Sequence, residues 1–306
     1  MGAGGVPGRS GLPALALTMP QFSVEPEASL AACRDARRLG FAGAFVFDHL
    51  WPLGPDRTRP ALECWTLLAA LAAEVGRQHA DPSVGRFRVG TLVTRAGLRA
   101  PALVARMAAT VGQAAGAAPI VGVGRGDPVN RDENLAYGLP YPDAATRAAD
   151  LEATVAALRG PDAGRPRPPL WVGGVGPVAR ELAGRLADAW NGWALAPEEL
   201  AAGLADVRRA AERAGRDPAL VAGTWGGQVL VAPDRGEAEA VLARWGAGRP
   251  PTEVARVLAG DPGTVMARLR ALHDAGAAWC VLAPVGAPGS GQRALLAAAA
   301  GLPRRG

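Results

Sequence analysis

Short apolar runs typical of β-strands alternate with longer amphipathic runs typical of helices along the whole chain. The expected strands cover residues 14–21, 42–47, 87–94, 119–124, 169–173, 189–193, 221–231 and 278–284. The expected helices lie near residues 27–39, 101–115, 144–158, 178–187, 197–214 and 292–300. Another helix follows the loop that ends near residue 60 and runs to residue 75, and the unit after the seventh strand has two helices, near 237–245 and 263–275. Eight alternating units without a separating linker predict a single closed (β/α)8 barrel of the TIM type. A doubly wound open sheet is the alternative arrangement of the same elements.

Length and composition agree with one large domain. The chain has 306 residues, of which 49% are apolar and 20% charged, so it can bury a full core. No apolar stretch is long enough, and free enough of charge and proline, to predict a membrane span. Residues 1–12 are glycine-rich and lack the apolar region of a signal peptide. We therefore expect a flexible lead over residues 1–12, followed by one cytoplasmic barrel domain over residues 13–306.

All 33 basic residues are arginine, and they exceed the 28 acidic residues by the net charge of +5. The arginines are scattered, with no run longer than two, whereas proteins that bind nucleic acid usually carry a clustered basic face. The absence of lysine indicates a coding bias more than a basic function. The charge pattern therefore favours an enzyme with a small anionic ligand and argues against a nucleic-acid partner.

Cysteine and histidine spacing gives no indication of a metal or redox site. The cysteines lie far apart in apolar surroundings and form no CxxC pair, so we expect buried free thiols: Cys33, Cys64 and Cys280. The histidines show neither HExxH nor HxH spacing, so we expect no metal: His49, His79 and His273.

Polar and glycine residues follow several of the expected strands, which in a barrel places them on the catalytic face. They are Asp48, Thr94, Arg125-Gly126-Asp127, Gly173-Gly174 and Asn191. His49 stands out because imidazole exchanges protons near neutral pH, although a histidine that packs on Trp51 in a loop is an equally simple interpretation.

Two glycine-rich loops are candidate cofactor sites. VGVGRGD at 121–127 does not fit the dinucleotide fingerprint, because Asp127 occupies the last required position. It predicts either a close approach of backbone to a cofactor or a simple turn. In LWVGGVGPVA at 170–179, Gly174, Gly176 and Ala179 do fit the fingerprint, but the next strand does not end in an acid. We therefore interpret the second loop as a phosphate cradle at a helix N-terminus within a barrel.

Four segments, in chain order, resemble motifs of the bacterial luciferase-like oxidoreductases, and within them those of the coenzyme F420-dependent barrel enzymes. They are GFAGAFVFDH at 40–49, VGTLVT with RAP at 89–101, VGVGRGD with YG, R and LE at 121–152, and PLWVGG with LA, AD and WN at 169–191. The resemblance covers about residues 15–284. It implies a luciferase-like (β/α)8 barrel that binds its cofactor at the C-terminal ends of the strands.

The resemblance also implies roles for single residues. The family's proton-exchanging histidine corresponds to His49, its nearby tryptophan to Trp51 and its acid after the glycine loop to Asp127. A bulge with a non-prolyl cis peptide in the third strand would fall at Thr91–Leu92 and support the cofactor ring. The remaining expected cofactor-binding residues are Asp48, Gly124, Gly126, Gly173, Gly174, Val175 and Gly176. From its position directly before His49, Asp48 is expected mainly to anchor the loop.

The sequence also departs from the family. Residues 112–119, GQAAGAAP, lack the Ser-Gly-Gly-Arg that usually precedes the fourth strand, and there is no lysine to clamp a sugar phosphate. The favoured function is an F420-dependent oxidoreductase that moves a hydride to or from a small organic substrate. An FMN-dependent monooxygenase and a non-catalytic cofactor-binding barrel are the alternatives. The resemblance further implies a homodimer, with apolar helix residues near 67–75 as a compatible surface.

Overall fold

The computed structural model describes residues 11–22, 24–52, 56–77, 87–161, 166–286 and 290–305. Of the expected lead over residues 1–12, residues 1–10 therefore lie outside the described part. No helix in the described part is long and apolar enough to cross a membrane.

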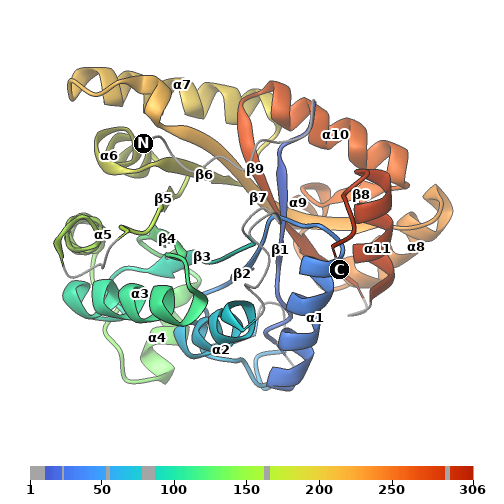
Figure 1. Ribbon diagram of the computed structural model, residues 1–306, viewed down its shortest axis with the longest axis horizontal. Coiled ribbons are helices and arrows are strands. Elements are labelled where there is room, and N and C mark those ends of the chain that lie inside the picture. The colour runs from blue at the N-terminus through green and yellow to red at the C-terminus, as the bar shows by residue number, and fades with distance from the viewer. Residues whose placement is uncertain are drawn as a thin grey trace.

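Eight parallel strands close into a barrel at the centre of the molecule, with helices around it (Figure 1). Neighbours along the chain pair with each other, and the last strand pairs with both the seventh and the first, which closes the ring. The barrel strands are β1 (Ala14–Thr18), β2 (Gly43–Val46), β3 (Arg88–Arg95), β4 (Ile120–Gly124), β5 (Leu170–Gly173), β6 (Ala189–Trp193), β7 (Ala222–Val231) and β9 (Ala277–Pro284). The predicted single (β/α)8 barrel is confirmed.

The helices pack their apolar faces on the outside of the barrel, where they form the larger of its cores. Several begin with proline in the first turn, a position that needs no backbone N–H. They are α1 (Pro26–Arg38), α2 (Cys64–Gly76), α3 (Pro101–Ala115), α4 (Asn130–Ala136), α5 (Ala144–Arg159), α6 (Pro177–Leu186), α7 (Pro197–Arg213), α8 (Arg235–Gly246), α9 (Pro251–Ala255), α10 (Pro262–Asp274) and α11 (Ser290–Ala299).

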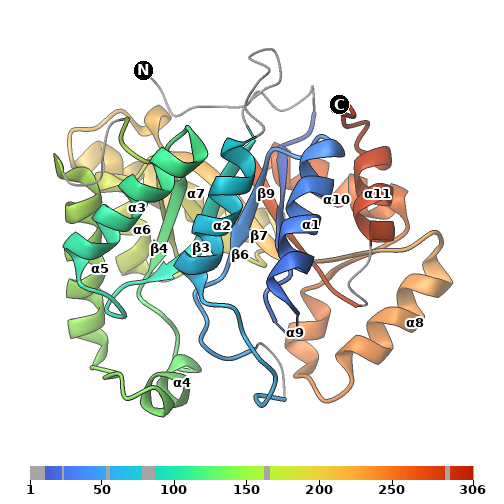
Figure 2. The same cartoon turned by 60° about the horizontal axis from the view of Figure 1, so that its bottom comes forward.

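Four of the described elements were not expected from the sequence: α4, α9, the 3-10 helix Pro218–Leu220 and the short strand β8 (Leu258–Gly260), which pairs with β7 outside the ring. Helix α4 begins NRDEN and lacks an apolar period, so its sequence resembles a loop. Figure 2 shows α4 and α9 at the same end of the barrel, away from the C-terminus of the chain. This is the end towards which the parallel strands run.

A separate core fills the inside of the barrel. Phe45 stacks on Trp171 with ring centroids 5.3 Å apart, and Trp279 meets both rings edge-on at 6.4 and 5.8 Å. These rings come from β2, β5 and β9. The interior of the barrel is thus packed with side chains, as in other barrels of this type.

Strand β3 carries a bulge near the C-terminal end of the barrel. Thr91 pairs with Val121 and Thr94 with Val123, so β3 has one extra residue between these pairs. The peptide Leu92–Val93 within the bulge is cis. The expected position, Thr91–Leu92, is therefore wrong by one residue: Thr91 keeps its regular pairing, and its hydroxyl donates to the Gly122 carbonyl at 2.9 Å.

Candidate functional site

Asp48 anchors the loop after β2. Its carboxylate is only 2% exposed and accepts hydrogen bonds from the Arg95 backbone N–H at 2.9 Å and from the Arg99 guanidinium at 2.7 and 3.1 Å. Arg99 also contacts Glu63. Burial lowers the pKa of Arg99, but Asp48 and Glu63 outweigh burial and raise that pKa above its usual value. Both oxygens of Asp48 are thus used within the protein, and its expected contact with a cofactor stays a prediction.

His49 follows on the same loop, with about 24% of its side chain exposed. Its Nδ1 atom lies 3.5 Å from Oε2 of Glu133, and its ring meets Phe47 edge-on at a centroid distance of 6.5 Å. A carboxylate beside Nδ1 favours the tautomer that carries its proton there. The Nε2 atom has no hydrogen-bond partner among the described residues.

Glu133, on α4, was missed by the sequence analysis. It is buried, and its carboxylate accepts from the backbone N–H groups of Leu50 and of Trp51, the latter at 2.9 Å. The Arg95 guanidinium lies 3.2 Å away. Burial alone would raise the pKa of Glu133, but His49, Arg95 and the Trp51 N–H outweigh it and lower the pKa to about 2. Glu133 is therefore a fixed negative charge that faces His49.

A signal for Glu133 is present in the sequence. Asn130, Glu133 and Asn134 are spaced i, i+3 and i+4, which puts three polar side chains on one face of a helix directly after the β4 glycine loop. In the structure all three are buried, and the Asn130 amide donates to Glu133 at 2.9 Å. Asn134 accepts from Arg95 at 2.9 Å. A polar helix face that is buried needs polar partners, which here are supplied by the loop after β2 and by Arg95.

Helix α4 holds the loop after β2 through further contacts. The Tyr137 hydroxyl donates to the Leu50 carbonyl at 3.0 Å. Arg57 lies over the Trp51 ring, 5.0 Å from its centroid, and 3.9 Å from Asp132 on α4. Trp51 is thus covered by a cation, and its expected role near a cofactor ring stays a prediction.

The β3 bulge explains three glycines of the neighbouring strands. A Cβ atom at Gly122, Gly124 or Gly173 would lie 2.7 to 3.0 Å from the Val93 side chain. These glycines therefore make room for Val93 at the cis peptide. Packing accounts for Gly124 and Gly173 without a ligand, and their expected contact with a cofactor stays a prediction.

The loop before α6 keeps free backbone donors at the helix N-terminus. Gly174 has φ +133°, but its N–H is already donated to the Asn191 carbonyl at 3.2 Å. The helix starts at Pro177 after Gly176, which caps it without a side chain. Among the described residues, no acceptor is found for the N–H groups of Val175, Gly176, Val178 and Ala179. If the loop holds a phosphate, these donors would bind it, and Gly174 would shape the turn.

Arg125 and Asp127 flank Gly126 in the loop after β4. A Cβ atom at Gly176 would lie 3.8 Å from Nη2 of Arg125, so the guanidinium faces the loop before α6. Within the described residues its side chain has no hydrogen-bond or ion-pair partner. Gly126, with φ +73°, sits beside the amide of Asn130. Asp127 is exposed and forms no ion pair with His49.

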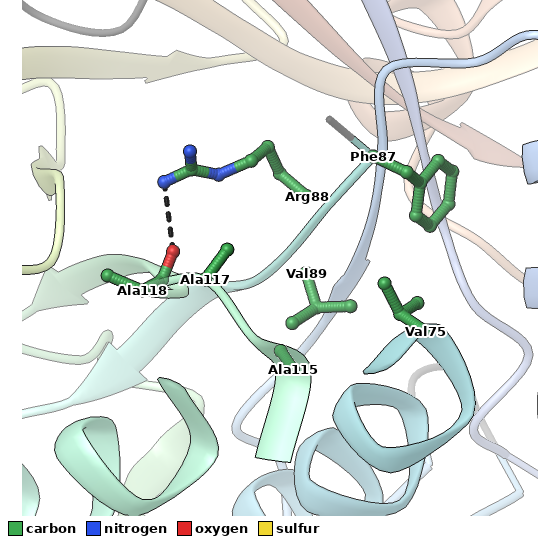
Figure 3. Close-up of a pocket in the computed structure, with 7 residues that line it drawn as sticks. All are labelled: Val75, Phe87, Arg88, Val89, Ala115, Ala117 and Ala118. Atoms are coloured by element: carbon green, nitrogen blue, oxygen red, sulfur yellow. Dashed lines mark hydrogen bonds between the residues drawn. The ribbon is translucent and has the colours of Figure 1, made fainter. Parts of the chain in front are cut away.

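Two hollows lie at opposite ends of the barrel. One, with about 300 Å³ of empty space, adjoins the site between the ends of β3 and β4 and is lined by Arg95, Arg125, Gly126, Asn130, Tyr141 and Arg147, among others. The other, of about 180 Å³, lies where β3 begins and is shown in Figure 3. There the Arg88 guanidinium donates to the Ala118 carbonyl at 2.9 Å. The second hollow is at the wrong end of the barrel to serve His49.

The sequence model of the luciferase-like monooxygenase family matches residues 15–256. The chain belongs to this family of oxidoreductases. Within the described part, no group of three or more His, Cys, Asp or Glu side chains could hold a metal ion.

Relatives in the luciferase-like family carry more than one chemistry. A phthiodiolone/phenolphthiodiolone dimycocerosates ketoreductase of Mycobacterium kansasii is 32% identical over 238 residues, which are 70% of this chain and 60% of that protein. An F420-dependent glucose-6-phosphate dehydrogenase of Beutenbergia cavernae is 30% identical over 240 residues, 69% of this chain and 66% of that protein. The chain thus spans about 60% of the length of the ketoreductase.

Solved structures agree with the fold. An F420-dependent secondary alcohol dehydrogenase, in complex with an F420-acetone adduct, superposes with a TM-score of 0.76 at 20% identity over 94% of this chain and 98% of that one. The EDTA monooxygenase EmoA from Chelativorans sp. BNC1 gives the same TM-score at 14% identity, over 96% of this chain and 95% of that one. At these identities the likeness concerns the fold alone.

Proposed function

We propose that this luciferase-like protein is an F420-dependent oxidoreductase that moves a hydride between the deazaflavin and an organic substrate. The observation that carries the proposal is His49, which Glu133 contacts on Nδ1 while Nε2 is left for substrate. Hydride transfer to or from an alcohol or carbonyl carbon needs a partner for the accompanying proton, and an oriented imidazole provides one. The similarity to an F420-dependent glucose-6-phosphate dehydrogenase supports the same cofactor.

The residues at the catalytic end fit such a cofactor. The bulge at Leu92 and Val93 offers a platform for a flat ring, and the free N–H groups at the start of α6 suit a phosphate. Arg125 adds a positive charge beside that helix. When bound, the deazaflavin supplies the two-electron hydride chemistry, and the protein positions it and handles the proton.

In this mechanism each residue has a separate task. Nε2 of His49 takes the hydroxyl proton as an alcohol is oxidised, or returns it as a carbonyl is reduced. Glu133 holds the ring in one orientation and stabilises the imidazolium that forms, as the third group of a nucleophile–base system does. Asp48, with Arg95 and Arg99, fixes the loop that carries His49. Asp127, on the same end of the barrel, is a supporting acid near the ring.

Titration of the purified protein with F420 and, separately, with FMN tests the cofactor. We expect F420 to bind and FMN to bind at least tenfold more weakly, measured by the change in cofactor fluorescence. Arg125→Ala should weaken F420 binding by about tenfold or more, because a hydrogen bond to a charged group contributes about 1.5–3 kcal/mol. The fold should be unaffected, since Arg125 has no partner among the described residues.

Arg208→Ala is the matched control, because Arg208 is exposed on α7. It removes the same charge and should leave the dissociation constant unchanged. An equal loss in both variants would indicate a long-range charge effect and count against a phosphate contact by Arg125. Preferential FMN binding with oxygen consumption would instead support the monooxygenase, whereas binding of neither cofactor would contradict both oxidoreductase proposals.

We also propose a homodimer, on the family resemblance. The leucines of α2 do not supply the contact, because Leu67, Leu68 and Leu71 are buried against the chain's own core. Sedimentation at micromolar concentration should give twice the 31.2 kDa of the chain. A particle with the mass of a single chain would contradict this proposal.

A further inference from the structure

Three half-buried aromatic side chains form a continuous surface beside His49. Phe22 stacks on Phe47 with centroids 6.4 Å apart, and Trp193 meets Phe47 edge-on at 5.7 Å. Phe47 in turn contacts the His49 ring at 6.5 Å. Trp193 is the last residue of β6, Phe47 directly follows β2, and Phe22 lies in the loop after β1. We call Phe22, Phe47 and Trp193 the aromatic wall.

The aromatic wall reaches from His49 to the β3 bulge. A Cβ atom at Gly226 on β7 would lie 2.8 Å from Cε3 of Trp193 and 3.0 Å from Cδ2 of Leu92. The Trp193 ring therefore lies on the Gly226 backbone, next to the residue that starts the cis peptide. A substrate that joins the proposed cofactor platform to His49 must pass along this wall.

The side chain of Gln21, which precedes Phe22, is already hydrogen-bonded to the backbone. The Gln21 amide donates to the carbonyls of Phe47 and Leu62 at 2.7 and 2.8 Å and accepts from the Phe47 N–H at 2.9 Å. Its hydrogen-bonding capacity is thus taken up by the backbone, and little is left for substrate hydroxyls.

The charges near His49 also disfavour an anionic substrate. Each arginine of this region is paired with a carboxylate, Arg95 with Glu133, Arg99 with Asp48 and Arg57 with Asp132, although Nη2 of the buried Arg95 has no hydrogen-bond partner among the described residues. The charge that faces His49 directly is the carboxylate of Glu133. A phosphate on the substrate would lack a free cation among these residues and would lie near that carboxylate.

We propose that the substrate is an uncharged secondary alcohol or ketone with an apolar, ring-sized substituent that packs on the aromatic wall; this rests on the proposed function. In oxidation, the carbinol carbon gives its hydride to the oxidised deazaflavin, the hydroxyl proton passes to Nε2 of His49, and the C–O bond becomes a carbonyl. Reduction is the reverse. The apolar substituent is excluded from water against Phe47 and Trp193, which orients the reacting carbon between the ring platform and His49.

The test compares kcat/KM for propan-2-ol, cyclohexanol, 1-phenylethanol and glucose 6-phosphate at saturating F420, together with the matching ketones and reduced F420. The kcat/KM of the ring-bearing substrates should exceed that of propan-2-ol and acetone by at least about tenfold, since a hydrophobic site discriminates between substrates with and without an apolar group on that scale. Glucose 6-phosphate should give no measurable turnover. A preference for glucose 6-phosphate, a flat series, or no turnover in either direction would overturn the inference.

A variant of Phe22 tests whether the aromatic wall is the source of the preference for ring-bearing substrates. Phe22→Ala should lower kcat/KM for cyclohexanol about tenfold and that for propan-2-ol by a several-fold smaller factor. Leu220→Ala removes an exposed apolar side chain from the turn that precedes β7 and should change neither. Equal losses on both alcohols would overturn the assignment of Phe22 to the apolar substituent.

The F420 dissociation constant of each protein shows whether a negative result contradicts the aromatic-wall inference alone or the proposed function as well. Normal F420 binding with the wrong substrate preference contradicts only the aromatic-wall inference. Loss of F420 binding in the unmodified protein contradicts the proposed function, and this inference with it.

Discussion

Replacement of His49 by alanine is expected to lower turnover by about 10²–10⁴-fold, the usual contribution of a general acid–base group. The Nδ1 atom of His49 faces Glu133, so its Nε2 is the proton-exchanging nitrogen, and alanine offers none. F420 affinity should change little, because the platform at Leu92–Val93 and the donors of α6 remain. The measurements are kcat with the best substrate of the series and the dissociation constant of F420.

His273→Ala is the matched control for this experiment. His273 lies on α10, where its Nδ1 atom contacts the Ala277 carbonyl at 3.3 Å, and its loss should leave turnover near the normal value. Asp127→Asn should reduce turnover less than His49→Ala, because Asp127 is exposed and does not contact His49. If His49→Ala turned over at the normal rate, His49 would be a packed loop residue against Phe47.

The fold could be predicted because its signal is local and repeated. Each barrel strand is a short apolar run, and the α3 bounds, Pro101–Ala115, follow from an N-terminal proline and a left-handed glycine, Gly116, after the last turn. Helix α4 could not be predicted in the same way. Its stability comes from contacts with residues about 80 positions earlier in the chain, such as the Glu133 bond to the Trp51 N–H.

The site was only partly predictable for a similar reason. Asp48 and His49 are visible because they directly follow a strand. The partner of His49, by contrast, comes from α4, and the acid expected from position, Asp127, makes no contact with it. The bulge was expected in β3, but the cis peptide lies at Leu92–Val93 because the hydroxyl and pairing of Thr91 keep that residue in the regular ladder. The spacing of residues along the chain does not indicate such contacts between distant segments or the exact pairing of neighbouring strands.

Replacement of Glu133 by glutamine is expected to lower the stability of the fold. Glu133→Gln keeps the shape but removes the charge that Arg95 and His49 face, and breaking a buried pair by loss of one partner costs about 3–5 kcal/mol. We expect the free energy of unfolding at neutral pH to fall by about 3 kcal/mol, measured by urea denaturation. Asp132→Asn, the exposed neighbour on the same helix, should change it by less than about 0.5 kcal/mol.

The pH dependence of stability identifies the carboxylate of Glu133 as the source of this effect. Its pKa is about 2 in the folded protein against the ordinary 4.5, so the unfolded chain binds the proton first as the pH falls. The stabilisation from Glu133 is therefore fully present above about pH 5 and is lost progressively between the ordinary pKa and about pH 2. Because other carboxylates titrate in the same range, the informative quantity is the difference between the two proteins. The gap in unfolding free energy between wild type and Glu133→Gln should narrow as the pH is lowered from 5, whereas a gap that stays constant would show that Glu133 acts by packing and not by its charge.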